Sequence, residues 1–167
     1  MEVYSRYIEV LSNLLTVSNY FVDYPFANRL YPKSLDVVEH VKKWGPAALL
    51  TGGDVVFQPR KVQRSGLFEA VDGNVLIYVH KEENHGHVGQ VYPADHYILV
   101  DDKLRILTVA KKVRGVRVNT VFVGQGHYAV DRQVLAAYPP ADVAIERIDH
   151  LLNVEAQTLL GACKAGH

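Results

Sequence analysis

The chain has 167 residues, with 18 basic and 18 acidic side chains, so its formal net charge at pH 7 is zero. That length suits one domain with one core, and zero net charge gives no overall attraction toward nucleic acid or an anionic membrane surface. The lone Cys163 excludes an intrachain disulfide, and with neither a membrane-length apolar run nor a signal-peptide pattern we expect a cytoplasmic protein.

The N-terminal part of the chain has the pattern of a helix. Apolar residues recur at helical spacing over residues 3–22, and prolines then interrupt the pattern. We treat residues 1–31 as a helical segment that precedes the main body of the fold. A second helix is expected from about residue 32 to 44, where Gly45-Pro46 ends it.

From residue 47 onward, short apolar runs alternate with helical segments. Runs without alternation are typical of parallel strands that are covered on both faces. The prediction is a doubly wound α/β fold with a mainly parallel sheet over residues 32–154, followed by a tail at 155–167. The predicted strands are 47–50, 75–79, 97–100, 119–123 and, more weakly, 142–145, with helices at about 55–67, 104–113 and 146–154.

The ends of the predicted strands carry the polar groups that suggest chemistry, because ligands bind at the carboxyl ends of strands in such sheets. Thr51, Gly52, Gly53 and Asp54 follow the first run. Two glycines let the backbone approach a ligand closely, and amide groups at the start of a helix attract an anion. The alternative is a tight turn in which Asp54 caps the next helix.

The next two strand ends carry a lysine and a pair of aspartates. Lys81 follows the second run, and Asp101 and Asp102 end the third. Two neighbouring carboxylates suit a hard cation such as Mg²⁺, and a lysine nearby would offset their charge. The alternatives are a solvated Lys81, and an Asp102 that caps the following helix while Asp101 stays in water.

Two further groups of residues have simpler interpretations. His80, His85 and His87 lie close together, but no cysteine or second spacing pattern completes a tetrahedral zinc site, so a polar loop is favoured. A solvated helix face is favoured over a nucleic-acid patch for a basic cluster, since no aromatic residues are interleaved with it. Its members are Lys111, Lys112, Arg114 and Arg117.

Taken in order, these features resemble the haloacid dehalogenase-like (HAD) hydrolases, a superfamily made up mostly of phosphatases. LLTGGD, with Thr51, matches the second motif of that family, and QPRKVQRSGLFEAV matches the helix that follows it. Lys81 is the best match to the third motif, and YILVDD matches the acidic pair of the fourth. The resemblance extends from about Tyr24 to Leu152 and implies that residues 1–31 are cap-like helices beside an HAD-like core.

The resemblance also implies roles for the strand-end residues. Thr51, with the backbone near Gly52 and Gly53, would bind phosphoryl oxygens. Lys81 would hold the phosphoryl group and offset the carboxylates. Asp102, together with Asp101, would hold Mg²⁺, which neutralises developing charge during phosphoryl transfer.

One motif of the family has no match. It is Asp-x-Asp-x-Thr on the first strand, and its first aspartate is the nucleophile. No aspartate in these 167 residues is followed by another two positions later. The resemblance therefore implies a sheet that is missing its first central strand, which in the family lies between the strands corresponding to 47–50 and 97–100.

A gap in the sheet centre is costly, because each buried backbone group left unpaired costs about 1–3 kcal/mol. We therefore expect an oligomer or a rearranged sheet centre. Four arrangements would fill the gap: closure of the two neighbouring strands, entry of another segment, pairing with a second copy of the chain, or a natural gene product that is longer than this chain.

Two functions from different classes follow from these residues. The first is a Mg²⁺-dependent, phosphatase-type hydrolase of a small phosphorylated metabolite. The second is a catalytically inactive relative that keeps the site for binding or as scaffold. Thr51, Lys81 and Asp102 favour the hydrolase family as identity, whereas the missing nucleophile predicts that this polypeptide alone does not turn over.

Overall fold

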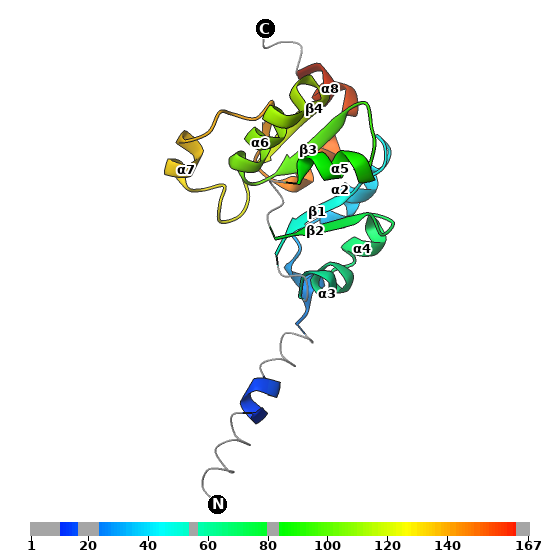
Figure 1. The fold of residues 1–167 in the computed structure, drawn as a ribbon, viewed down its shortest axis with the longest axis vertical. Helices are drawn as coiled ribbons and strands as arrows, with labels where there is room; N and C mark the ends of the chain where they lie inside the picture. The colour runs from blue at the N-terminus through cyan, green and yellow to red at the C-terminus, as the bar shows by residue number, and fades with distance from the viewer. Residues whose placement is uncertain (1–10, 17–23, 54–56, 80–83, 163–167) are drawn as a thin grey trace, which may run out of the picture.

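The computed structural model describes residues 11–16, 24–53, 57–79 and 84–162. Strands and short helices alternate along the chain, as expected for an α/β fold (Figure 1). The strands are β1 (Leu49–Gly52), β2 (Val75–Tyr78), β3 (Tyr97–Asp101), β4 (Val118–Val123) and β5 (Val143–Ile145). The helices are η1 (Phe26–Arg29), α2 (Ser34–Val41), α3 (Phe57–Arg64), α4 (Leu67–Ala70), α5 (His85–Val91), α6 (Leu104–Arg114), η3 (Gly115–Arg117), α7 (Arg132–Ala136), η4 (Ile148–Asn153) and α8 (Ala156–Ala162).

The strands form two sheets rather than one. β1 pairs with β2, and β3, β4 and β5 form a second sheet in that order, with every ladder parallel. Within the described part of the chain, no ladder joins β1 to β3. The parallel arrangement confirms the prediction from the apolar runs. The separation of β1 from β3 shows that these two strands have not closed up into a single sheet.

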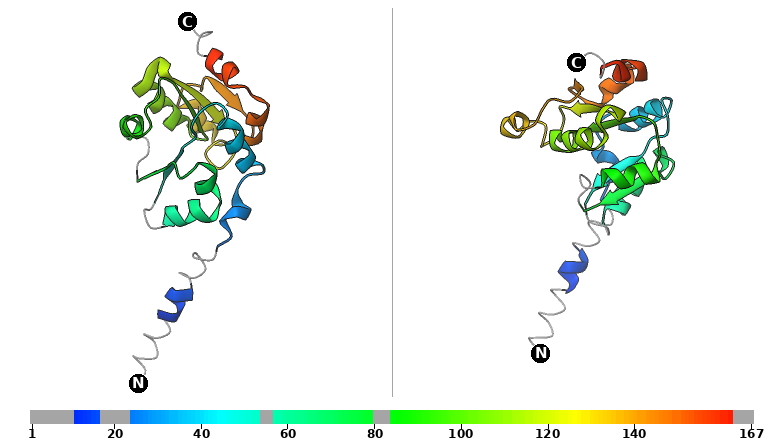
Figure 2. Two further views of the ribbon diagram at one scale, coloured as in Figure 1. Left: turned by 90° about the vertical axis from the view of Figure 1, so that its right-hand side faces the viewer. Right: turned by 45° about the horizontal axis from the view of Figure 1, so that its top comes forward.

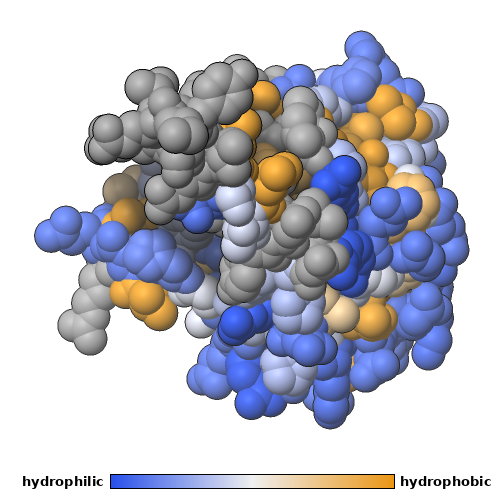
Figure 3. Space-filling view, turned by 90° about the horizontal axis from the view of Figure 1, so that it is seen from below, coloured by the Kyte–Doolittle hydropathy of each residue, from blue (hydrophilic) through white to orange (hydrophobic). Residues whose placement is uncertain are grey.

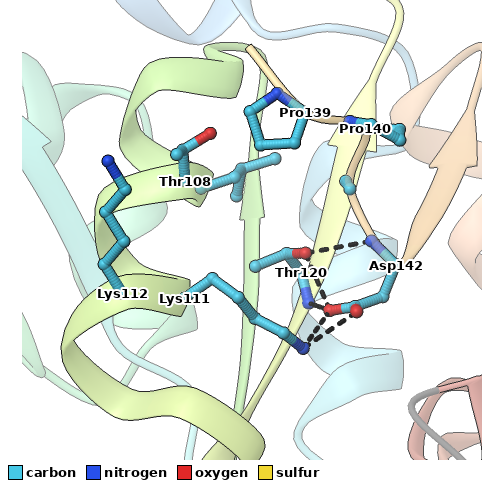
Figure 4. A pocket seen from close by; sticks show the side chains of 9 residues that line it. Thr108, Lys111, Lys112, Thr120, Pro139, Pro140 and Asp142 are labelled. Carbon is cyan, nitrogen blue, oxygen red and sulfur yellow. Dashed lines mark hydrogen bonds and ion pairs between the residues drawn. The ribbon is translucent and has the colours of Figure 1, made fainter. Parts of the chain in front are cut away.

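Helices cover both faces of the three-stranded sheet, whose centre is β4. Successive residues of a strand point to opposite faces. Val121 packs with Val37 of α2, Leu151 of η4 and Leu159 of α8 in one buried cluster. Thr120 points the other way, toward Lys111 of α6 (Figure 4). This two-sided covering is the doubly wound arrangement that the sequence predicts.

The helix α6 illustrates why the apolar pattern predicts its element well. Four of its side chains are buried, and its last turn is basic, which suits the negative end of the helix dipole. Gly115 (φ +57°) then ends the helix. The buried side chains are Leu104, Ile106, Leu107 and Ala110.

Three predicted helices differ in the structure. Where one helix was expected at about 55–67, the structure has the shorter helix α3. Gly66 (φ +79°) then turns the chain, and the separate helix α4 follows it. The closing helix expected over 146–154 is instead the 3-10 helix η4. Of the long N-terminal helix, only residues 11–16 are described; they are helical and exposed.

The C-terminal segment beyond residue 154 contains a helix that packs on the sheet. Leu159 of α8 is fully buried, and its carbonyl accepts a hydrogen bond of 2.8 Å from Asn119 Nδ2 on β4. Figures 1 and 2 show α8 beside β4 from different sides. The helix therefore contributes to the core, although no apolar periodicity pointed to it.

The surface has a mixed character. Seen from below the view of Figure 1, apolar residues form separate patches among polar ones (Figure 3). No helix among the described residues is long and apolar enough to cross a membrane.

Candidate functional site at the carboxyl end of β3

Asp101 and Asp102 lie where β3 ends and the chain turns into α6. Asp101 Oδ1 accepts a hydrogen bond of 3.0 Å from the backbone N–H of Lys103. Asp102 does not cap α6, whose N-cap residue is Lys103 and which has no side-chain cap. The alternative interpretation, in which Asp102 caps the helix and Asp101 is merely solvated, is therefore wrong. The carboxylate of Asp102 therefore does not serve as the cap of α6.

The electrostatic setting of Asp102 is that of a carboxylate crowded by a second one. Burial raises the pKa of the Asp102 carboxyl, and the charge of Asp101 and a hydrogen bond with it raise that pKa further. Lys103 lowers the pKa by a smaller amount. No cation among the described residues forms an ion pair with Asp102. Two close carboxylates of this kind fit a divalent cation, whose oxygen ligands they would supply.

Lys103 follows the acidic pair directly, but its side chain makes a different contact. Its ammonium nitrogen lies 3.7 Å from the centre of the Tyr128 ring, a cation–π contact. Tyr128 belongs to the segment QGHYA, which follows β4 and also contains Gly126. The carboxyl ends of β3 and β4 therefore meet, as expected for adjacent parallel strands.

Gly126 lies close to the side chains of both Asp102 and Tyr31. Its φ of +90° favours glycine, and a Cβ built on it would lie 3.0 Å from Asp102 Oδ2 and 3.1 Å from Tyr31 Oη. Sequence reasoning missed both Gly126 and Tyr31. The segment QGHYA was a visible signal for Gly126, whereas Tyr31, on the turn before α2, had no pattern that could have marked it.

Thr51, Gly52 and Gly53 lie at the end of β1, as predicted, but the Gln58 side chain packs against this segment, where the absence of a Cβ at Gly53 makes room for it. The carbonyl of Gly52 accepts a hydrogen bond of 2.6 Å from Gln58 Nε2. A Cβ on Gly53 (φ +149°) would lie 2.5 Å from the same nitrogen. Between described residues, no hydrogen bond or ion pair joins this segment to the aspartate pair.

Several predicted site residues lie outside the described residues. They include Lys81, Asp54 and His80, so the roles expected of them stay predictions. His87 lies within the described residues, and its Nδ1 is 2.6 Å from Tyr78 Oη. Among the residues that can be described, no group of three or more His, Cys, Asp or Glu side chains could hold a metal ion.

Two cavities lie away from the aspartate pair. One, of about 260 Å³, lies beside Pro139 and Pro140, where Lys111 and Asp142 already neutralise each other (Figure 4). The other, of about 360 Å³, includes Arg114, whose guanidinium stacks 4.0 Å from the centre of the Tyr97 ring. Neither cavity includes Thr51 or the aspartate pair among its lining residues.

Comparison with known proteins supports the family resemblance. No family model matches the sequence, and no curated protein matches it. A solved structure does: a protein from Burkholderia xenovorans LB400, provisionally assigned as a haloacid dehalogenase-like hydrolase. It is 52% identical in sequence, with a TM-score of 0.82, over 87% of this chain and 67% of its own. The chain belongs to the haloacid dehalogenase-like hydrolase family.

Proposed function

We propose that the chain forms the cation- and phosphoryl-binding part of a Mg²⁺-dependent hydrolase that acts on a small phosphorylated metabolite. The observation that carries this proposal is the pair Asp101 and Asp102 at the end of β3. The two carboxylates crowd each other, and Asp102 has no cation partner among the described residues. A shared divalent cation would relieve that repulsion, which is why the pair supports a metal site.

The residues have distinct roles under this proposal. Asp102, with Asp101, would hold Mg²⁺, which supplies charge neutralisation for phosphoryl transfer. The Thr51 hydroxyl would donate a hydrogen bond to a phosphoryl oxygen. Lys81 would hold the same group through its ammonium. The reaction further needs a nucleophile, and an Asp-x-Asp pair is absent from these 167 residues.

Among the described residues, β1 and β3 each pair with another strand on one edge only, and these unpaired edges support a missing strand between them. Leu49 and Gly53 direct their N–H groups to β2, so alternation places the backbone groups of Leu50 and Gly52 on the other edge. On that edge, Gln58 Nε2 donates a hydrogen bond to the Gly52 carbonyl. Every residue of β3 is only half-buried, whereas β4 is almost fully buried. A two-stranded sheet such as β1–β2 has little stability of its own.

Completion of the sheet is therefore part of the proposal. An extended strand would pair with the free edges of β1 and β3 and bring Thr51 and Asp102 to the same sheet edge. That strand would come from a second copy of the chain in a homo-oligomer, or from residues beyond these 167. Sedimentation of the isolated chain separates the two sources, because only the first produces a dimer or larger assembly.

Hydrolysis of an aryl phosphate tests the function. The chain alone is expected to give no turnover. Addition of a synthetic peptide with an apolar strand followed by Asp-x-Asp-x-Thr should give Mg²⁺-dependent turnover, and Asp102→Asn in the chain should abolish it. The matched control is the same peptide with both aspartates replaced by asparagine. Turnover by the chain alone would contradict the need for a supplied nucleophile.

A second function has one specific observation in its favour, namely the absence of the nucleophile motif from the chain. This second function is that of a catalytically inactive relative, whose site binds a cation or phosphate, or serves as scaffold, without catalysing a reaction. Calorimetry with Mg²⁺ distinguishes the two functions when it is combined with the peptide experiment. Binding that is lost in Asp102→Asn, without turnover at any peptide concentration, would favour the inactive relative.

A further inference from the structure

The cavity of about 360 Å³ lies at the opposite end of β3 from the aspartate pair. Tyr97 lines this cavity and begins β3, whereas Asp101 ends the strand, about 13 Å away at 3.3 Å per residue. The volume is in the range of pockets that bind small molecules. Because neither Asp101 nor Asp102 lines it, the cavity is separate from the site of the proposed function.

The guanidinium of Arg114 is held in one orientation on the wall of this cavity. Its Cζ lies 4.0 Å from the centre of the Tyr97 ring. The Tyr97 hydroxyl accepts a hydrogen bond of 3.1 Å from Ala94 N–H and donates one of 2.9 Å to the Tyr92 carbonyl, so the ring is itself anchored. Helix α5 comes so close that a Cβ on Gly89 would lie 3.0 Å from a guanidinium nitrogen. A group held in this way loses little conformational freedom when it binds a ligand.

A second arginine lines the same cavity. Gly115 (φ +57°) ends α6 directly after Arg114, and η3 then places Arg117 on the cavity wall. Arg117 is exposed, and no ion pair among the described residues involves it. The sequence grouped both arginines with Lys111 and Lys112 in one basic cluster. In the structure the two lysines line the other cavity, so the arginines form a separate pair.

We propose that Arg114 and Arg117 form a binding site for a phosphate-class dianion. Two guanidinium groups match the charge of a dianion, and their planar forks bind phosphate oxygens bidentately. A guanidinium has five N–H donors, so it can bind an oxyanion while it keeps other contacts. Among the described residues, no acidic side chain lines the cavity to repel the anion. This inference goes beyond the proposed function and does not depend on it.

Calorimetry with inorganic phosphate tests the proposal. The titration contains EDTA, which removes divalent cations and so prevents phosphate from binding through Mg²⁺ at the aspartate pair. The 167-residue chain should bind phosphate, and Arg117→Gln should raise the Kd by about tenfold or more, the loss expected for hydrogen bonds to a charged group. Lys112→Gln is the matched control, because it removes the same charge from an exposed residue of the other cavity. Its Kd should stay near that of the parent.

A second variant tests the position of Arg114. Gly89→Ala should raise the Kd for phosphate severalfold, because the added Cβ would displace the guanidinium from the Tyr97 ring. Gly86→Ala is the control, since it lies on the same helix but a Cβ there meets nothing within 4 Å. Alanine favours a helix over glycine, so both variants should keep α5, and circular dichroism checks that they are folded.

The ligand can be the free ion or a phosphate group on a small organic molecule. Phenyl phosphate, titrated under the same conditions, distinguishes the two. Tighter binding than that of inorganic phosphate would indicate an organic phosphate, because only that ligand contacts the apolar side chains of Pro93 and Val113 on the cavity wall. Equal binding would indicate the free ion. Acetate should bind more weakly than either, and equal binding of acetate would overturn the assignment to a dianion.

The remaining outcomes decide whether the site exists and whether it is separate. The proposal is overturned if the parent chain binds no phosphate. It is also overturned if Arg117→Gln and Lys112→Gln weaken binding equally, because net charge alone would then explain the effect. Asp102→Asn should bind phosphate in EDTA as the parent does, and weaker binding would place the anion at the aspartate pair instead. Titration of the parent with Mg²⁺ tests the proposed function independently, so failure of one leaves the other standing.

Discussion

Lys111 and Asp142 form an ion pair in which Lys111 Nζ lies 2.8 Å from each carboxylate oxygen (Figure 4). The same carboxylate accepts hydrogen bonds from the backbone N–H and the hydroxyl of Thr120, each 2.8 Å long. Lys111 also donates to the carbonyl of Val118 at 2.9 Å. This network joins α6, β4 and the start of β5, at the end of the sheet away from Asp101.

Asp142→Asn should destabilise the fold in a pH-dependent way. Burial alone raises the pKa of the Asp142 carboxyl, but hydrogen bonds from Lys111 and Thr120 outweigh it, so the pKa is below the ordinary 3.8. A group with a lowered pKa in the folded state contributes its full stability above the unfolded value, and that contribution is lost as pH falls through the folded value. The loss in Asp142→Asn should be about 1–3 kcal/mol at pH 7.

Urea unfolding from pH 3 to pH 7 measures this effect. The difference between parent and Asp142→Asn should begin to shrink as pH falls below about 4, where the carboxyl of the unfolded chain takes up a proton. It should shrink further as pH falls through the lower pKa of the folded state. Asp72→Asn is the control, because Asp72 forms a surface ion pair with Lys42 and its φ of +54° suits asparagine equally well. A difference that is the same at every pH would contradict the assigned pKa.

Leu159→Ala should cost about 2–5 kcal/mol of unfolding free energy, because it leaves a cavity in a packed core. Leu159 is fully buried, whereas the adjacent Leu160 on the same helix is 40% exposed. Leu160→Ala should therefore have a much smaller effect, and the two variants have the same change in helix propensity. Equal losses in urea unfolding would show that α8 does not pack on β4.

Two glycine substitutions should have opposite effects on stability. Gly66→Ala should destabilise by about 1–2 kcal/mol, because φ is +79° between α3 and α4. Gly161→Ala should stabilise by about 0.5–1 kcal/mol, since Gly161 lies within α8 and a Cβ there meets nothing within 4 Å. Thermal unfolding of the two variants against the parent tests both signs. Stabilisation by Gly66→Ala would show that the turn does not need its left-handed backbone.

Mg²⁺ should raise the thermal midpoint of the chain, because a ligand that binds only the folded state stabilises it. The gain should be about 2.7 kcal/mol when Mg²⁺ is at a hundred times its Kd. Chelation with EDTA should reverse the shift, and Asp102→Asn should remove it. Asp131→Asn is the control, since Asp131 caps α7 and asparagine caps equally well. A shift that persists in Asp102→Asn would place the ion elsewhere.

The sequence alone predicted those parts of the fold that depend on local pattern. The strands β3 and β4 and the helix α6 carry continuous or periodic apolar residues, and each was predicted to within about two residues of its bounds. Helix α8 was missed because Leu159 is buried by contacts with distant residues, and Asn119 holds it through a hydrogen bond across 40 positions in sequence. Local patterns contain no information about such partners.

The position of the aspartate pair at a strand end followed from the sequence, because a strand end is a local feature. The proximity of Tyr31 and Gly126 to Asp102, and the separation of β1 from β3, required the tertiary structure. The physical reason is the same in both cases. Residue type and spacing determine which backbone forms locally, whereas contacts between segments far apart in sequence depend on how the elements pack in space.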